Sequence, residues 1–383
     1  MHSGFNMEKK AAKANIDSAF IVSLALVAGT GLASLYSASY GYAISLDKAA
    51  SYFVLRQLTW FVPASLAFLA AAFVPMDWLR KNMMLFVLPS IFMLLLPFFP
   101  VIGISKNGAA RWFGFAGSMF QPSELVKPML ILYLAHILDK KSDRLSDVLN
   151  GLIPPLAIAC CTVFIVLAQN DFSTAFMLAL ISVLMLWITE LPLIFFGAFA
   201  TIALPLASLS VLTNPYRLRR ILGFIVPGYD PANLSYQVNS SIRAIKAGGF
   251  MGKGFGQGTL KLHSIPEVYS DFVFSSWVEE TGFIGVLFFV VLWLVFLSKA
   301  FGAAFREEDS FRSSLVFGSA AYLAAQILIN IMVVSGAAPA TGLPLPFFSS
   351  GGSSLLSVSI TTGFIYNILR TGRNSRKLES EYV

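Results

Sequence analysis

Ten apolar runs, each of roughly 20 residues, follow one another along this chain, and each is long enough to cross ~30 Å of hydrocarbon as an α-helix. Only 12% of the 383 residues are charged, whereas a soluble protein carries about 25%. A membrane barrel would show short segments of alternating hydrophobicity instead. We therefore predict an all-α polytopic membrane protein with about ten membrane-spanning helices. The predicted spans are 16–38, 52–74, 83–103, 122–138, 151–168, 172–189, 191–213, 274–298, 313–335 and 354–370.

Lysine and arginine are distributed unequally between the two sides of this topology. The short loops of one side hold only Lys48, Lys106 and Arg111. The tails and loops of the other side hold Lys9, Lys10, Lys13, Arg80, Lys81, Lys140, Lys141, Arg144, Lys299, Arg306, Arg312, Arg370, Arg373, Arg376 and Lys377. The positive-inside rule places this second side, with both termini, in the cytoplasm. The net charge of +7 mostly reflects this bias and gives no reason to expect a nucleic-acid partner.

The chain is predicted to form a single integral membrane domain over 1–383, with cytoplasmic tails at 1–15 and 371–383. A large extracytoplasmic loop, 214–273, separates the seventh and eighth spans. Its basic residues are Arg217, Arg219, Arg220, Arg243, Lys246, Lys253 and Lys261, against Asp230, Glu267 and Asp271. Loops of this length are usually functional. Its charge suits either an anionic ligand, such as a lipid head group or a pyrophosphate, or a general attraction to anionic lipid.

Within this loop the pattern of residues 235–245 predicts a short amphipathic helix. The following stretch, 248–258, contains six glycines in eleven residues. Such a segment could hold a phosphate with its N–H groups, or it could simply be flexible. It is not a nucleotide-binding fingerprint, because no βαβ unit surrounds it. Asp271 follows at the mouth of the eighth span, where a partly buried carboxylate could act as a general base or cap the helix.

Several charged residues fall within or beside predicted spans, where charge is costly: Arg56, Glu124, Lys127, Asp171, Glu279 and Glu280. Glu124 and Lys127 are three residues apart, so they lie on one helix face and can form an ion pair. This pair could staple a helix or belong to a site. All six residues map to the outer half of the membrane, on the side of the large loop, which favours a site. The histidines and cysteines show no metal-ligand spacing, so no protein metal site is predicted.

Four sequence blocks resemble the SEDS family (shape, elongation, division and sporulation), whose members include FtsW, RodA and SpoVE. They run over 108–112 with 121–127, over 169–174, from Tyr236 to Phe272, and over 342–354, in the family's order. The chain departs from the family pattern at Asn170, Ser173 and Ser350. The spacing before Pro266 is slightly closer to that of FtsW, whereas residues 341–346 resemble RodA as much as FtsW. A role in division is therefore preferred over one in elongation, but both stay open.

The resemblance implies a peptidoglycan glycosyltransferase that polymerises lipid II into β-1,4 glycan by an inverting mechanism. It implies that Asp271 is the catalytic base. Substrate-binding candidates are Glu124, Lys127, Arg111, Trp112, Arg243, Lys253 and Lys261. Residues expected to shape the cavity are Gln121, Asp171, Gln237, Glu267, Pro344, Pro346, Ser349, Gly351 and Gly352. A divalent cation, Mg²⁺ or Mn²⁺, could assist the leaving group, although the sequence shows no cage for one, and no organic cofactor is expected.

The resemblance also implies three kinds of partner: lipid II, a class B penicillin-binding protein that crosslinks the new strands, and proteins of a division or elongation complex. The stretch 336–352, rich in proline and glycine, is predicted to be a broken or re-entrant segment that lines the cavity. A lipid II flippase is an alternative function, because transporters also use intramembrane charges and broken helices. A non-enzymatic scaffold for the penicillin-binding protein is another, but it leaves Asp271 and the Glu124–Lys127 pair unexplained.

Overall fold

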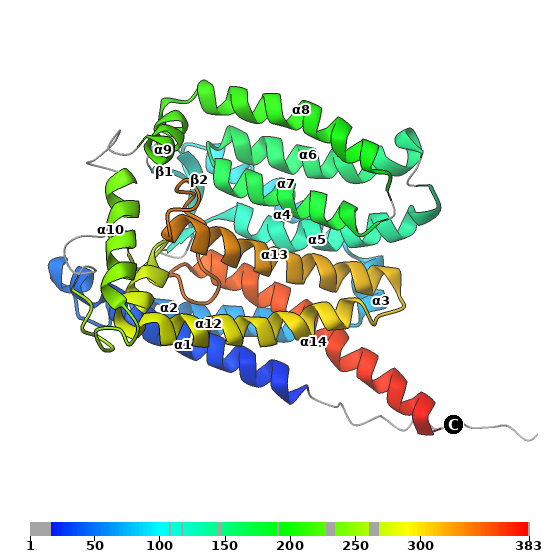
Figure 1. Ribbon diagram of the computed structural model, residues 1–383. Helices are drawn as coiled ribbons and strands as arrows, with labels where there is room; N and C mark the ends of the chain where they lie inside the picture. Colours follow the sequence, from blue (N-terminus) through cyan, green and yellow to red (C-terminus); the bar gives the residue numbers. More distant parts are fainter. Residues whose placement is uncertain are drawn as a thin grey trace, which may run out of the picture.

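The computed structural model describes residues 17–106, 109–115, 118–144, 147–189, 191–226, 234–259 and 268–381. Its long helices lie side by side in one bundle (Figure 1). Seven helices are long and apolar enough to cross a membrane: Ser18–Ser45, Tyr52–Phe73, Val148–Ala168, Leu193–Leu212, Val273–Ala304, Ser310–Val334 and Gly352–Gly372. Two shorter apolar helical stretches, Met84–Phe98 and Phe172–Trp187, accompany them. The prediction of a helical polytopic membrane protein is confirmed.

Each of the ten predicted spans coincides with helix. The helices are α1 (Ser18–Ser45), α2 (Tyr52–Phe73), α3 (Met76–Lys81), α4 (Met84–Met93), α5 (Pro122–Lys140), α6 (Ile153–Ala168), α7 (Phe172–Trp187), α8 (Leu193–Leu212), α12 (Val273–Ala304), α13 (Ser310–Val334) and α14 (Gly352–Glu381). A π-helical turn, Val148–Leu152, leads into α6. The third predicted span ends too late: α4 stops at Met93 and a single 3₁₀ turn, Leu96–Phe98, follows. Pro97 and Pro100 cannot donate the backbone hydrogen bonds that would continue the helix.

The prediction of an all-α chain is wrong between α4 and α5, where a small antiparallel sheet forms. Its strands are β1 (Gly103–Lys106), β2 (Ala109–Phe115) and β3 (Ser118–Phe120), in the order β1-β2-β3. Ile104 lies opposite Trp112, and Phe113 lies opposite Phe120. These aromatic and β-branched cross-strand pairs favour a strand over a loop. The sheet carries Arg111 and Trp112, and its last strand leads directly into the start of α5.

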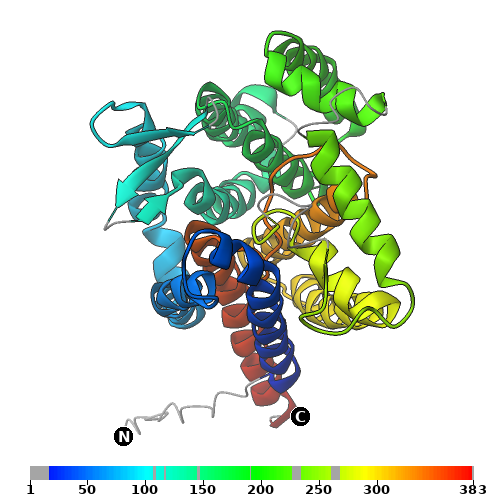
Figure 2. The same ribbon diagram turned by 90° about the vertical axis from the view of Figure 1, so that its left-hand side faces the viewer.

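The sheet lies at one end of the bundle together with two further helices, α9 (Pro215–Ile225) and α10 (Leu234–Gly248), and we call this the loop end (Figures 1 and 2). Figure 1 shows α10 lying across the ends of the long helices. It confirms the helix predicted over 235–245. Helix α9 was not predicted; on it Arg217 and Arg220 are half-buried, whereas Arg219 is exposed.

Helix α12 is broken at Gly282, whose φ of 64° and ψ of −158° are not helical. Residues 248–259, here called the glycine loop, pair with the chain around this break. The N–H groups of Lys253 and Gly254 donate to the carbonyls of Glu279 and Glu280, both at 3.0 Å. The N–H of Phe283 donates to the carbonyl of Gly249, also at 3.0 Å. The N–H groups of Lys253 and Gly254 therefore bond to carbonyl groups left without helical partners at the break, and they do not form a phosphate cradle.

Residues 335–351, here called the connecting segment, join α13 to α14 without regular structure. Leu343, Leu345 and Phe348 within it are at most 2% exposed. Irregular backbone at membrane depth is tolerated where protein surrounds it, because its polar groups then find partners. The burial agrees with the broken segment predicted over 336–352.

Candidate functional site

A buried ion pair near the start of α5 is the centre of the site. The Lys127 ammonium lies 2.6 Å from Oε1 of Glu124, and the two residues are 0% and 3% exposed. Pro122 opens the helix, so both residues fall in its first two turns. The other oxygen of Glu124, Oε2, is buried and has no hydrogen-bond partner among the described residues. The predicted ion pair is confirmed.

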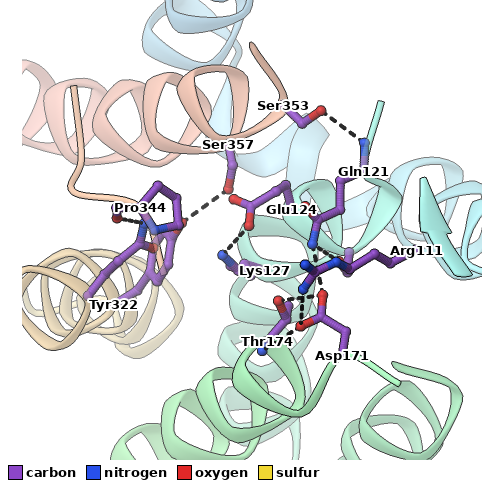
Figure 3. A network of polar contacts seen from close by, with 12 residues as sticks. Arg111, Gln121, Glu124, Lys127, Asp171, Thr174, Tyr322, Pro344, Ser353 and Ser357 are labelled. Carbon is purple, nitrogen blue, oxygen red and sulfur yellow. Dashed lines mark hydrogen bonds and ion pairs between the residues drawn. The ribbon is translucent and has the colours of Figure 1, made fainter. Parts of the chain in front are cut away.

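Asp171 forms a second centre at the start of α7, beside the ion pair (Figure 3). It caps α7 by accepting from the N–H of Thr174 at 3.2 Å and from its hydroxyl at 2.9 Å. Gln121 Nε2 donates to the same carboxylate at 2.8 Å, and Arg111 Nη1 lies 3.4 Å away. Asp171 is 1% exposed. One carboxylate thus joins strand β2 and helices α5 and α7, and it brings Arg111, Gln121 and Asp171 together.

Helices α13 and α14 close the other side of this network, as Figure 3 shows. The backbone N–H of Gln121 donates to the hydroxyl of Ser353 at 2.9 Å. The Lys127 ammonium lies 5.5 Å from the centre of the Tyr322 ring, whose hydroxyl is 3.4 Å from that of Ser357. The ion pair is therefore enclosed by four helices from distant parts of the sequence.

Asp271 lies just before α12 and is held through its backbone. Its carbonyl accepts from Asn330 Nδ2 at 2.9 Å, and the same amide nitrogen donates to the carbonyl of Leu343 at 2.8 Å. Ser270 donates its hydroxyl to Oδ1 of Asp271 at 2.9 Å. A side chain on Gly342 would place its Cβ 3.2 Å from Oδ2 of Asp271. The backbone of Asp271 is thus held by α13, and its carboxylate lies between Ser270 and the connecting segment.

Sequence reasoning missed the two amides that hold this region. Gln326 Nε2 donates to the carbonyl of Pro344 at 2.7 Å, one helical turn from Asn330 on α13. The sequence does contain a signal for them: two amide side chains lie four residues apart in an apolar span, and such a spacing places them on one face of a helix.

Three arginines meet around the start of α7. Arg111 reaches Asp171, and Arg217 Nη2 donates to the side-chain oxygen of Asn170 at 3.3 Å. Arg220 Nη1 donates to the carbonyl of Thr341 at 3.3 Å, and the hydroxyl of Ser173 donates to that same carbonyl. Partial burial lowers the pKa of Arg217, and the nearby Asp171 opposes this effect. Only Arg111 of these three had been singled out from the sequence.

Two of the remaining substrate-binding candidates, Lys253 and Arg243, lie away from Asp171. Lys253 pairs with Glu279 at 2.7 Å, which ties the glycine loop to α12. Arg243 is exposed and contacts Ser240 and Tyr236 of its own helix, on which Gln237 is half-buried. Trp112 stacks beneath the Arg111 guanidinium at 4.2 Å. Lys261 and Glu267 lie outside the described residues.

The predicted motif at the end of the connecting segment anchors it to α2. Gln57 donates to the carbonyl of Ser349 at 3.4 Å and accepts from the N–H of Gly351 at 3.2 Å. Gly352 approaches Trp60 so closely that a Cβ would lie 2.2 Å from the indole. Pro346 is buried beside them, and Pro344 accepts from α13 as described. These contacts join the end of the connecting segment to α2.

Within the part of the chain that the structure describes, no three His, Cys, Asp or Glu side chains lie close enough together to hold a metal ion. The available donors therefore do not fit a metal site built by the protein alone.

Comparisons with known proteins match the chain over nearly all of its length. The family model described as "Cell cycle protein", covering FtsW, RodA and SpoVE, matches residues 17–374. The probable peptidoglycan glycosyltransferase FtsW of Geobacter sp. (strain M18) is 35% identical over 338 residues, covering 88% of this chain and 92% of that protein.

Two solved structures have a similar fold. One, from a study of the coordination of polymerization and crosslinking by a peptidoglycan synthase complex, has a TM-score of 0.72 at 27% identity and covers 93% of this chain and 98% of that one. The other is the crystal structure of the rod shape determining protein RodA of Thermus thermophilus. Its TM-score is 0.67 at 25% identity, with 93% and 97% of the two chains covered.

Proposed function

Because the chain belongs to the cell cycle protein family of FtsW, RodA and SpoVE, and is a peptidoglycan glycosyltransferase of the inner membrane, we propose that it polymerises lipid II with Asp271 as the general base. The resemblance expected from the four sequence blocks is confirmed by the family match. The observation that carries the assignment of the base is the fixed position of Asp271, between Asn330 and Gly342 at the loop end.

The proposed topology has ten spans, with both termini in the cytoplasm and the loop end outside. Three features support it: each predicted span contains a helix, the basic residues of the short loops and tails gather on one side of the predicted topology, and the glycine loop and the connecting segment lie at the loop end. The active site then faces the extracytoplasmic space. The lipid tail of the substrate can remain in the bilayer while its head group reaches Asp271.

The proposed reaction joins two lipid-linked sugars. The 4-hydroxyl of one substrate attacks the anomeric carbon of the other, and Asp271 accepts the hydroxyl proton. The new C–O bond forms as the bond to pyrophosphate breaks, and its electron pair leaves with the pyrophosphate. Attack opposite the leaving group turns the α-linked donor into a β-1,4 glycan, so configuration is inverted.

We assign the buried ion pair to the sugar or peptide portion of lipid II. Oε2 of Glu124 lacks a partner among the described residues and can accept a hydrogen bond from a substrate hydroxyl or amide. Lys127 pairs with the other oxygen of Glu124, and Gln121 and Asp171 fix the start of the helix that carries both. This role explains why a costly buried charge pair is retained.

A class B penicillin-binding protein is the proposed partner, within a division or elongation complex. A similar fold was solved in a peptidoglycan synthase complex that polymerises and crosslinks, which supports this proposal. A divalent cation, Mg²⁺ or Mn²⁺, would need most of its ligands from the substrate pyrophosphate, because the described residues offer no cage.

Replacing Gly342 by Ala should slow polymerisation by roughly 10- to 100-fold, because displacing a catalytic group by about 1 Å can cost that much. Gly342 has φ +77°, which strains an alanine, and the new Cβ would press on Asp271. Gly256→Ala is the matched control: its φ is +82°, and nothing lies within 4 Å of its Cβ position. Initial rates of glycan formation check the prediction, and equal rates in the two variants would contradict it.

The experiment that tests the function uses purified full-length protein with its penicillin-binding partner and labelled lipid II. Glycan ladders are the expected product. Movement of fluorescent lipid II across vesicles without any ladder would support the flippase, and neither activity from a folded complex would support the scaffold.

A further inference from the structure

We infer that Arg220 and Arg217 of α9 bind the pyrophosphate of the lipid II donor. This inference rests on the proposed function and adds the site for its leaving group. Both are among the seven basic residues of the large loop, but neither was named as a substrate-binding candidate from the sequence. The ligand chemistry is a pyrophosphate diester, which is a dianion suited to the forked donor geometry of guanidinium groups.

The first support is convergence. Arg217 contacts Asn170, Arg111 contacts the neighbouring Asp171, and Arg220 contacts the carbonyl that Ser173 also reaches. Arg111 and Arg217 therefore reach two adjacent residues at the start of α7, and Arg220 reaches a carbonyl that is bonded to α7 through Ser173. The Asp171 carboxylate offsets one of these positive charges, and a pyrophosphate dianion would supply further negative charge.

The second support is position relative to the base. Arg220 contacts Thr341, and Asp271 packs against Gly342, the next residue of the connecting segment. Consecutive Cα atoms are about 3.8 Å apart, so the guanidinium and the carboxylate flank one short piece of backbone. A displacement reaction needs this arrangement, with the base on the attacking oxygen and the cation on the departing oxygen beyond the anomeric carbon.

The third support is that Arg217 and Arg220 are less exposed than two other candidate cations, although Arg217 also donates through Nη1 to the carbonyl and the hydroxyl of Ser210. Lys253 is paired with the buried Glu279, and Arg243 is exposed on α10 beside Tyr236. Arg217 and Arg220 are half-buried, so their interactions with an anion would be screened less than those of an exposed residue.

The test compares Arg220→Gln and Arg217→Gln with Arg219→Gln. Arg219 lies on the same helix but is exposed, so its variant removes the same charge from the other face. The complex is reconstituted in nanodiscs of zwitterionic lipid, which removes general attraction to anionic lipid. Polymerisation of labelled lipid II is measured with undecaprenyl pyrophosphate, undecaprenyl phosphate or inorganic pyrophosphate added as inhibitor.

We expect Arg220→Gln to lower kcat/KM by about 100-fold, as removal of a donor from a developing anion does. Its inhibition constant for undecaprenyl pyrophosphate should rise about tenfold, while that for undecaprenyl phosphate changes less. Arg217→Gln should give smaller changes in the same direction, and Arg220→Lys should recover part of the activity. If the inhibition constant for inorganic pyrophosphate rises in Arg220→Gln as much as that for undecaprenyl pyrophosphate, the pyrophosphate group alone is recognised.

A purely structural role for Arg220 predicts lost activity with unchanged inhibition constants in the remaining active fraction, and that result would overturn the inference. Equal rates in Arg220→Gln and Arg219→Gln would overturn it as well, while leaving the polymerase intact. An absence of ladders from the wild-type complex would instead refute the proposed function itself.

Discussion

Replacing Asp271 by Asn should reduce glycan formation by about 10²- to 10⁴-fold, the range that general-base catalysis usually contributes. The substitution keeps the size of the side chain and removes its ability to accept the proton of the attacking hydroxyl. The fold should be retained, because Asn330 holds the backbone carbonyl of Asp271 and Ser270 can still donate to an amide oxygen. Ladders of labelled lipid II from the purified complex provide the measurement.

Ser270→Ala is the control for this experiment. It removes the hydrogen bond to Oδ1 but leaves the carboxylate, so its rate should fall by no more than about tenfold. Thermal unfolding of each variant verifies that the fold persists. If Asp271→Asn formed ladders at the wild-type rate, the polymerase would stand but Asp271 would not be its base.

Replacing Lys127 by Met should destabilise the protein by about 3–5 kcal/mol, because it leaves the buried Glu124 carboxylate without its partner. The unfolding temperature in detergent would fall clearly. The double variant Glu124→Gln with Lys127→Met removes both charges and should regain most of that free energy of unfolding. A single variant as stable as the wild type would show that the pair is not electrostatically coupled in the folded protein.

The activity of the double variant separates the two explanations of the pair. We expect restored stability with polymerisation still reduced, because the hydrogen-bonding carboxylate has been lost from the substrate site. If stability and activity returned together, the pair would be a structural staple and Glu124 would have no role with lipid II.

The spans were predictable because a run of about 20 apolar residues has the length and hydrophobicity needed to cross the hydrocarbon core as a helix. The Glu124–Lys127 pair was predictable because both partners lie on one helix, three residues apart. The helix over 235–245 was visible from its own periodicity. In each case the deciding interactions lie within one segment or with the solvent, so a single sequence contains the information.

Other parts of the site depend on contacts between distant segments, which periodicity does not report. Asn330 appeared only as a polar residue in an apolar span, yet it holds Asp271 and Leu343 together. The glycines after α10 left a phosphate cradle and simple flexibility both open, but the N–H groups of Lys253 and Gly254 donate to the carbonyls of Glu279 and Glu280. Arg220 was one of seven basic residues in the large loop until the fold placed it beside Thr341.

The break in α12 also bears on protein engineering. A backbone interrupted at Gly282 within an apolar helix needs hydrogen-bond partners, and the glycine loop supplies them through Lys253, Gly254 and the carbonyl of Gly249. Gly252 leaves no room for a side chain, since a Cβ would lie 2.1 Å from the carbonyl oxygen of Glu280. The two stretches therefore constitute one transplantable module. A chimaera that exchanges the large loop between relatives must therefore also exchange residues 277–285. Otherwise the carbonyl groups at the break in the recipient helix lose their hydrogen-bond donors.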